Sequence, residues 1–160
     1  MENIILIETS TALCSVALIQ DGKLTGYKEN AKDRAHASLT AVFVKELLDE
    51  AGLSLTDCSA VCVSMGPGSY TGLRVGVSTA KGLCFGAGIP LLATGTLDPL
   101  AWQAIAENLL PENCMYIVPM VDARRMEVYT ATFSSDGKQI SETVPAIIDE
   151  TSFSEILEQG

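Results

Sequence analysis

The chain has 160 residues, 48% apolar and 19% charged, which fits one folded domain or two small ones and excludes intrinsic disorder. Twenty acidic and ten basic side chains give a net charge of −10, so the chain as a whole repels nucleic-acid phosphates. If the protein acts on a nucleic acid, we expect a partner protein to make the contact. No apolar run approaches the ~20 residues that cross a bilayer, and "MENIILIETS" runs directly into a strand pattern, unlike a secretion signal.

The first thirty residues predict three strands in succession. Residues 3–8, "NIILIE", form a buried-strand run that a Thr-Ser-Thr turn follows. Residues 14–20 alternate apolar and polar side chains, the Asp-Gly pair at 21–22 is a hairpin turn, and residues 23–29 return.

A helix is predicted over residues 37–51, with Gly52 as its stop signal. Most of its apolar side chains share one broad arc, opposite a charged face. Leu39 and Val42 fall among the charges instead. They are either scattered surface residues, which are common, or part of a face that meets another chain.

Residues 59–65 predict the next strand, which leads into the glycine-rich stretch "SMGPGSYTGLRVG" at 64–76. Such a turn before a helix is either an anion-binding loop or a tight turn that lets the helix lie close to something else. The lysine of the P-loop pattern is missing, and Arg74 is the only nearby cation, so phosphate chemistry is weakly supported.

A helix predicted over residues 71–87 carries small side chains every four residues. Interior glycine costs a helix roughly 1 kcal/mol relative to alanine, so the repeat indicates that another backbone comes very close. That backbone belongs either to the same chain or to another subunit. The stripe consists of Gly72, Gly76, Ala80 and Cys84.

The second half of the chain repeats the order of the first. After a short strand at 89–96 and a helix at 97–110, strands are predicted at 115–123, 126–135 and 138–148, with an Asp-Gly turn at 136–137. Asp122 holds the place that Glu8 holds in the first half. We therefore predict a duplicated α/β fold with one subdomain at 1–98 and a second, incomplete one at 99–160.

Few residues offer catalytic chemistry. His36 is the only histidine, so no Ser-His-Asp arrangement is indicated. The five cysteines are scattered, which favours reduced thiols over disulfides or a zinc site. A nucleotide-held magnesium needs fewer protein ligands, and Glu8 or Asp122 could supply one.

Three stretches carry a family resemblance: "IILIETSTALCSVALIQDG", "SMGPGSYTGLRVGVSTAKGL" and "PMVDARRMEVYTATF". Together they resemble the TsaB (YeaZ) family, from Asn3 to about Phe133. The resemblance implies the actin-like, Hsp70-like (ASKHA) fold, in agreement with the duplicated plan. Members of the family are longer, so the chain resembles one that lacks its C-terminal portion.

The resemblance implies a role in making N6-threonylcarbamoyladenosine at position 37 of tRNAs that read codons starting with A. A TsaC-type enzyme makes threonylcarbamoyl-AMP, a metal-carrying TsaD-type subunit transfers the group, and a TsaE-type ATPase joins the complex. A TsaB-type protein pairs with TsaD without being the transferase. We thus expect a non-catalytic cytoplasmic subunit that forms a homodimer alone and a heterodimer with TsaD, with no direct contact to nucleic acid or membrane.

Other functions stay open as alternatives. One is a small ATP-dependent phosphotransferase or nucleotide hydrolase of the same superfamily, and another is a direct tRNA-binding module, which the −10 charge disfavours. Serine peptidase activity has no triad to support it. No cofactor is expected on this chain alone, although ATP, ADP or magnesium at an interface shared with TsaD is left open.

The resemblance also assigns residues, because the first two helices form the surface through which the family dimerises. We expect no catalytic and no metal-ligating residue. The partner interface is predicted at His36, Leu39, Val42, Phe43, Gly72, Arg74, Val75, Gly76 and Thr79. Vestigial phosphate contacts are predicted at Glu8, Thr9, Ser10 and Gly68. On this basis the glycine-rich stretch is a turn and a close-packing helix at a dimer surface, not a working phosphate loop.

Overall fold

A computed structural model describes residues 1–31 and 36–158, which form two compact units, Met1–Thr94 and Gly95–Gly160. The units divide where the chain leaves the last strand of the first sheet. The predicted boundary after residue 98 falls four residues later, inside a helix. Residues 159–160, the end of the predicted second subdomain, lie outside the described residues.

The first unit is built on a five-stranded sheet with the order β3-β2-β1-β4-β5. Its strands are β1 (Asn3–Glu8), β2 (Cys14–Gln20), β3 (Lys23–Asn30), β4 (Ala60–Ser64) and β5 (Leu91–Thr94). The three N-terminal strands are antiparallel neighbours, whereas β4 pairs parallel with both β1 and β5. The predicted strands at 3–8 and 14–20 are confirmed, and Asp21 and Gly22 turn the hairpin with positive φ.

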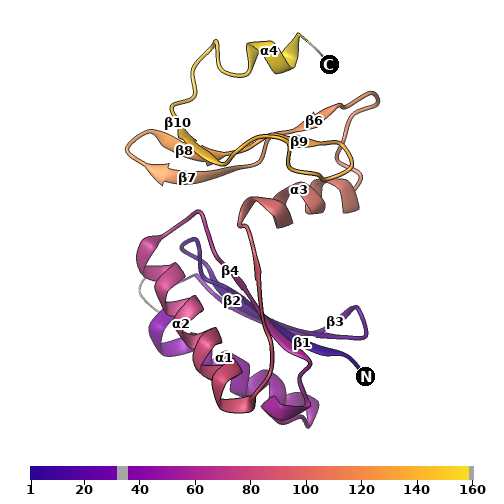
Figure 1. The fold of residues 1–160 in the computed structure, drawn as a ribbon, viewed down its shortest axis with the longest axis vertical. Coiled ribbons are helices and arrows are strands. Elements are labelled where there is room, and N and C mark those ends of the chain that lie inside the picture. The colour runs from indigo at the N-terminus through magenta and orange to yellow at the C-terminus, as the bar shows by residue number, and fades with distance from the viewer. Residues whose placement is uncertain (32–35, 159–160) are drawn as a thin grey trace. The chain divides into compact units, whose positions relative to one another are not determined.

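Two helices, α1 (His36–Ala51) and α2 (Tyr70–Ala87), lie side by side over one face of this sheet (Figure 1). Alternate strand residues point toward them, as the period of two requires. Leu47 and Leu48 of α1 and Ala80 of α2 meet that face. The buried strand residues that face the helices are Ile5, Ile7, Val16, Leu18, Val61 and Val63. Both predicted helices are confirmed, and Gly88 ends α2 with a left-handed cap.

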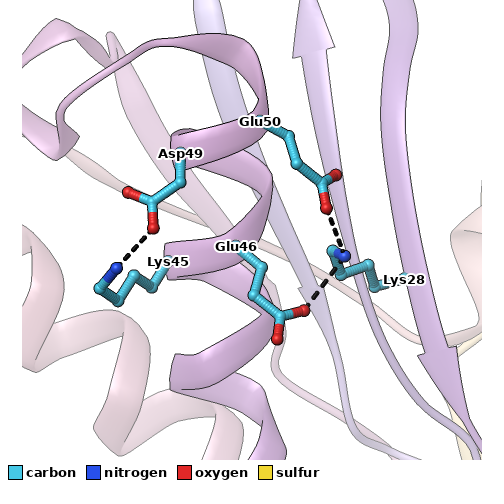
Figure 2. Close-up of polar contacts among 5 residues, drawn as sticks. All are labelled: Lys28, Lys45, Glu46, Asp49 and Glu50. Atoms are coloured by element: carbon cyan, nitrogen blue, oxygen red, sulfur yellow. Dashed lines mark hydrogen bonds and ion pairs between the residues drawn. The ribbon is translucent and has the colours of Figure 1, made fainter.

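The edge strand β3 is tied to α1 by charge (Figure 2). Lys28 Nζ lies 2.8 Å from Glu50 Oε1 and 3.1 Å from Glu46 Oε2. A separate pair, Lys45 with Asp49, runs along α1 itself. The two carboxylates raise the pKa of Lys28, because each favours its charged form.

We therefore expect Lys28→Gln to lower stability slightly at neutral pH and to remove part of the loss of stability at alkaline pH. A raised pKa in the fold means that the stabilisation is present below the unfolded pKa of about 10.5 and disappears as pH rises through the folded value. Urea midpoints measured from pH 8 to pH 11 test this. The pKa of Tyr27 is also raised, through its hydrogen bond to Glu29, so Tyr27→Phe is the control for the remaining alkaline change. Equal pH profiles for Lys28→Gln and the unmodified chain would contradict the assignment.

The second unit is less regular than the sequence predicts. It contains α3 (Leu97–Ala106), β6 (Tyr116–Ile117), β7 (Met120–Arg124), β8 (Glu127–Thr130), β9 (Phe133–Ser134), β10 (Val144–Ala146) and α4 (Ser154–Leu157). The strands form two small sheets, β10-β8-β7 and β6-β9. Phe133 and Leu97 centre its small core.

Four predicted elements of this unit differ in the structure. The expected strand 126–135 divides into β8 and β9, which join different sheets. The helix expected to residue 110 ends at 106, because Asn108 takes a positive φ. The expected strand 115–123 divides into β6 and β7 around Pro119, which has no N–H to donate to a ladder. The expected strand 138–148 is reduced to Val144–Ala146 and one isolated bridge at Gln139.

All five cysteines are free thiols, as the sequence predicts. Cys14, Cys58 and Cys84 are buried, whereas Cys62 and Cys114 are half-buried. Burial raises the thiol pKa of Cys58, Cys62 and Cys84. Across residues 1–31 and 36–158, no helix combines the length and the apolar character that crossing a membrane requires.

Candidate functional site

The end of β1 brings together the residues that were predicted as vestigial phosphate contacts. Glu8 turns its carboxylate back on the chain, and its Oε1 accepts the Ser10 N–H at 2.6 Å. Its Oε2 accepts the hydroxyl of Ser64 at the end of β4. Both carboxylate oxygens are therefore engaged, and the Ser10 N–H, which an anion would need, already serves Glu8.

The glycine-rich loop closes over the same turn. The Ser69 N–H donates to Ser10 O at 2.6 Å, and the Gly72 N–H donates to the Ser69 hydroxyl at 3.3 Å as an N-cap. Gly68 lies so close to the turn that a Cβ there would meet Ser10 Cβ at 2.8 Å. At the start of α2, the N–H groups of Ser69 and Gly72 therefore donate to acceptors in the same chain. Glu8, Thr9, Ser10 and Gly68 thus come together at one turn, where Gly68 packs directly against Ser10, and a phosphate contact there stays a prediction.

The stripe of small residues on α2 packs against the same turn. Gly72, Gly76, Ala80 and Cys84 are all buried. A Cβ on Gly72 would overlap the carbonyl oxygen of Thr9, and a Cβ on Gly76 would overlap its hydroxyl. The close backbone is therefore the end of β1 in this chain. Gly72 and Gly76, which were predicted at the partner interface, are buried against Thr9 within the first unit, and their contact with a partner stays a prediction.

Two buried hydroxyls of the turn lack partners. Within the described residues, Thr9 Oγ1 and Ser10 Oγ have no hydrogen-bond partner, and both side chains are almost completely buried. Thr9 directs its hydroxyl at Gly76, across the narrowest approach between strand and helix. Close packing at this turn thus leaves two buried hydroxyls without a hydrogen bond among the described residues, which costs free energy.

A depression of about 450 Å³ opens on the outer side of the two helices. Three of the predicted interface residues, Arg74, Val75 and Thr79, lie in its wall. Its other lining residues are Ala37, Tyr70, Thr71 and Ser78. The Arg74 guanidinium stacks on the Tyr70 ring, 5.4 Å from the centroid, and its Nη1 lies 3.4 Å from the Tyr70 hydroxyl. This pairing holds a cation and an aromatic ring together in an open position.

The predicted interface residues on α1 have mixed positions. Val42 is 44% exposed, Leu39 is half-buried, and Phe43 packs mainly against the core. His36 begins the helix and its Nε2 lies 3.0 Å from the carbonyl oxygen of Thr11. Among the predicted α1 residues, Val42 is thus the large apolar side chain that is exposed, whereas Leu39 and Phe43 are partly buried.

The sequence interpretation missed the aromatic residues on α2. Tyr70 is 74% exposed and Phe85 is 94% exposed. Gly82 and Gly86, on either side of Phe85, have open space where a Cβ would be. The available signal was the pattern itself, since 70, 74, 78, 81, 82 and 85 recur on the face of α2 opposite the small-residue stripe.

A second unusual feature lies at the β7–β8 hairpin. Asp122 Oδ1 accepts a hydrogen bond from the Arg124 N–H at 2.8 Å. In the first unit, Glu8 likewise accepts from the N–H two residues later, that of Ser10. Arg124, Arg125 and Met126 then have φ values of 66°, 54° and 66°. Left-handed backbone at non-glycine residues costs roughly 1–2 kcal/mol per residue. This hairpin therefore keeps large side chains at positions where glycine or asparagine would be relaxed.

The described part of the chain has no group of three or more His, Cys, Asp or Glu side chains that could hold a metal ion.

Comparison with known proteins gives consistent matches. The family model described as TsaD, tRNA N6-adenosine threonylcarbamoyltransferase, matches residues 26–157. The chain is 36% identical to the tRNA threonylcarbamoyladenosine biosynthesis protein TsaB of Escherichia coli, over 86% of this chain and 57% of the relative. It is 40% identical to the corresponding protein of Haemophilus influenzae, over 81% of this chain and 53% of the relative. The chain thus spans little more than half the length of these relatives.

A solved structure agrees in fold. YeaZ from Pseudomonas aeruginosa superposes with a TM-score of 0.76 at 32% identity, covering 92% of this chain and 68% of the other. The two chains therefore share the actin-like α/β fold that the family resemblance implies.

Proposed function

The chain belongs to the TsaB (YeaZ) family, and from this premise we propose that it is a non-catalytic partner subunit of the machinery that adds the threonylcarbamoyl group to N6 of adenosine 37 in tRNAs reading ANN codons. It binds and supports a TsaD-type transferase in the cytoplasm, forms a homodimer when alone, and joins a TsaE-type ATPase in the complete complex. Its relatives in Escherichia coli and Haemophilus influenzae are named for this biosynthesis.

The outer surface of α1 and α2 supports the partner role. The depression that gathers Arg74, Val75 and Thr79 is the single observation that carries it. Exposed Tyr70 and Val42 add apolar surface on the same pair of helices. Arginine and tyrosine are among the residues that contribute most at protein interfaces.

The turn after β1 supports a role without bond-making. The carboxylate of Glu8 is held by the Ser10 N–H and the Ser64 hydroxyl, and Gly68 presses against Ser10. A phosphate at this turn would have to displace those bonds. ATP, ADP or magnesium is therefore proposed to bind only at a surface completed by the transferase.

The proposal is tested by reconstitution. The chain is co-expressed and co-purified with the TsaD-type transferase from the same organism. Threonylcarbamoylation of tRNA by the transferase is then assayed with and without this chain. We expect a stable heterodimer and modification only when the chain is present. A transferase that is fully active alone would overturn the supporting role.

The alternative function, a small ATP-dependent phosphotransferase or nucleotide hydrolase, is separated by titration calorimetry. ATP with magnesium is added to the chain alone. No heat is expected, since the turn that would hold the phosphates is closed by its own hydrogen bonds. If ATP instead gives saturable binding heat, and Glu8→Ala abolishes that heat, the phosphotransferase or hydrolase function would be favoured.

A further inference from the structure

We propose that the hairpin residues Arg124–Met126, called the arginine tip, form a second recognition element for the transferase partner and bind a surface of that protein that carries carboxylates. The inference rests on the proposed function and extends it, because it assigns a contact outside the two helices. It is drawn from the charge distribution, the backbone and the exposure of the hairpin.

Charge is distributed very unevenly along the chain. Residues 95–160 carry eleven acidic and three basic side chains, a net −8 of the total −10. Two of those three basic residues are Arg124 and Arg125. None of the ion pairs found in the described residues involves either one. Arg124 and Arg125 are thus two adjacent positive charges in a strongly acidic unit, flanked in the sequence by Asp122 and Glu127.

The backbone of the tip indicates that its side chains matter. Arg124 pairs with Glu127, so Arg125 and Met126 are the two central residues of the hairpin. Positive φ at both of these positions is the geometry for which Asn-Gly is the relaxed sequence. Local rules that a sequence breaks in this way are expected at functional sites. The Asp122 carboxylate fixes the first N–H of the tip and so orients the two central residues of the turn.

The composition of the tip favours a protein partner. Met126 is 90% exposed beside the two arginines. Methionine and arginine are enriched at the centres of protein interfaces, whereas most other charged residues are depleted there. A nucleic acid would bring a dense row of phosphates against the eleven acids of the same unit, whereas a protein surface can place a few carboxylates at the tip alone. Carboxylates around a small apolar surface are the complement that fits both arginines and the methionine.

The test is titration calorimetry of the full chain with the TsaD-type transferase at 50 and 300 mM salt. Arg125→Glu is expected to weaken binding at least about tenfold and to flatten the dependence on salt. Lys138→Glu is the matched control, because it makes the same charge change in the same unit, and it is expected to change binding less than about twofold. If both variants bind like the unmodified chain, the inference is overturned while the proposed function stands. No binding by the unmodified chain overturns both.

A second variant distinguishes loss of the tip side chains from loss of stability. Replacing Arg125 with Asn and Met126 with Gly relaxes the turn, so the urea midpoint should rise while affinity for the transferase falls at least about tenfold. A raised midpoint with unchanged affinity would overturn the inference. Retardation of tRNA by the chain alone, lost with Arg125→Glu, would also overturn it in favour of nucleic acid.

Discussion

Alanine at Gly72 or Gly76 is expected to destabilise the first unit by about 3 kcal/mol or more, the upper part of the range for overpacking. The added Cβ would overlap the Thr9 carbonyl oxygen at Gly72 and the Thr9 hydroxyl at Gly76. Both partners are buried in the turn that also holds Glu8, so neither can move without opening the packing of α2 on β1. Urea unfolding followed by circular dichroism measures the effect.

The two glycines differ in a way that makes the prediction sharper. Thr9→Ala removes the hydroxyl and should recover much of the loss in Gly76→Ala, but none in Gly72→Ala, where the obstacle is backbone. Gly82→Ala is the control on the same helix. Nothing lies within 4 Å of its Cβ, so alanine should stabilise by up to about 1 kcal/mol. Equal effects at positions 76 and 82 would show that the close approach is not as described.

Arg74→Glu is expected to weaken the complex with the TsaD-type transferase at least about thirtyfold, which corresponds to the roughly 2 kcal/mol that defines an interface hot spot. Arg74 lies in the wall of the depression on the helices and stacks on Tyr70. Charge reversal removes that stacking and places an anion in the same position. Light scattering of the mixed proteins and titration calorimetry measure the loss.

Lys81→Glu is the matched control for this second prediction. It makes the same charge change on the same helix, but Lys81 is not among the residues that line the depression. Binding within about threefold of the unmodified chain is expected. Should Arg74→Glu and Lys81→Glu weaken binding equally, the effect would be long-range charge and the depression would lose its assigned role. Unchanged urea midpoints for both variants show that folding is not involved.

Much of the first unit could be predicted because local signals agree with its fold. The Asp21–Gly22 hairpin, the alternation in β2 and the glycine stops after both helices are each specified within a few residues. The second unit offered weaker signals. Pro119 interrupts a run that otherwise alternates like one strand, and β10 keeps only three residues of a segment predicted over eleven. Pairing partners, not propensity, decide such short strands.

The site was predictable only in part, because periodicity identifies a face but not its neighbour. The repeat of Gly72 and Gly76 correctly indicated a very close backbone. Whether that backbone was β1 or another subunit depends on the tertiary position of Thr9, which lies more than sixty residues earlier in the sequence. The exposed Phe85 was overlooked because a single apolar residue on a helix does not by itself indicate whether it is exposed or buried.

The distribution of the thiols provides intrinsic reporters of local opening. Four cysteines belong to the first unit and Cys114 alone to the second. Because burial both shields Cys58 and Cys84 and raises the pKa of their thiols, alkylation requires that their surroundings first separate. Mass spectrometry after a brief pulse of maleimide would therefore measure how often the first unit opens around Cys58 and Cys84, without any label introduced by mutation.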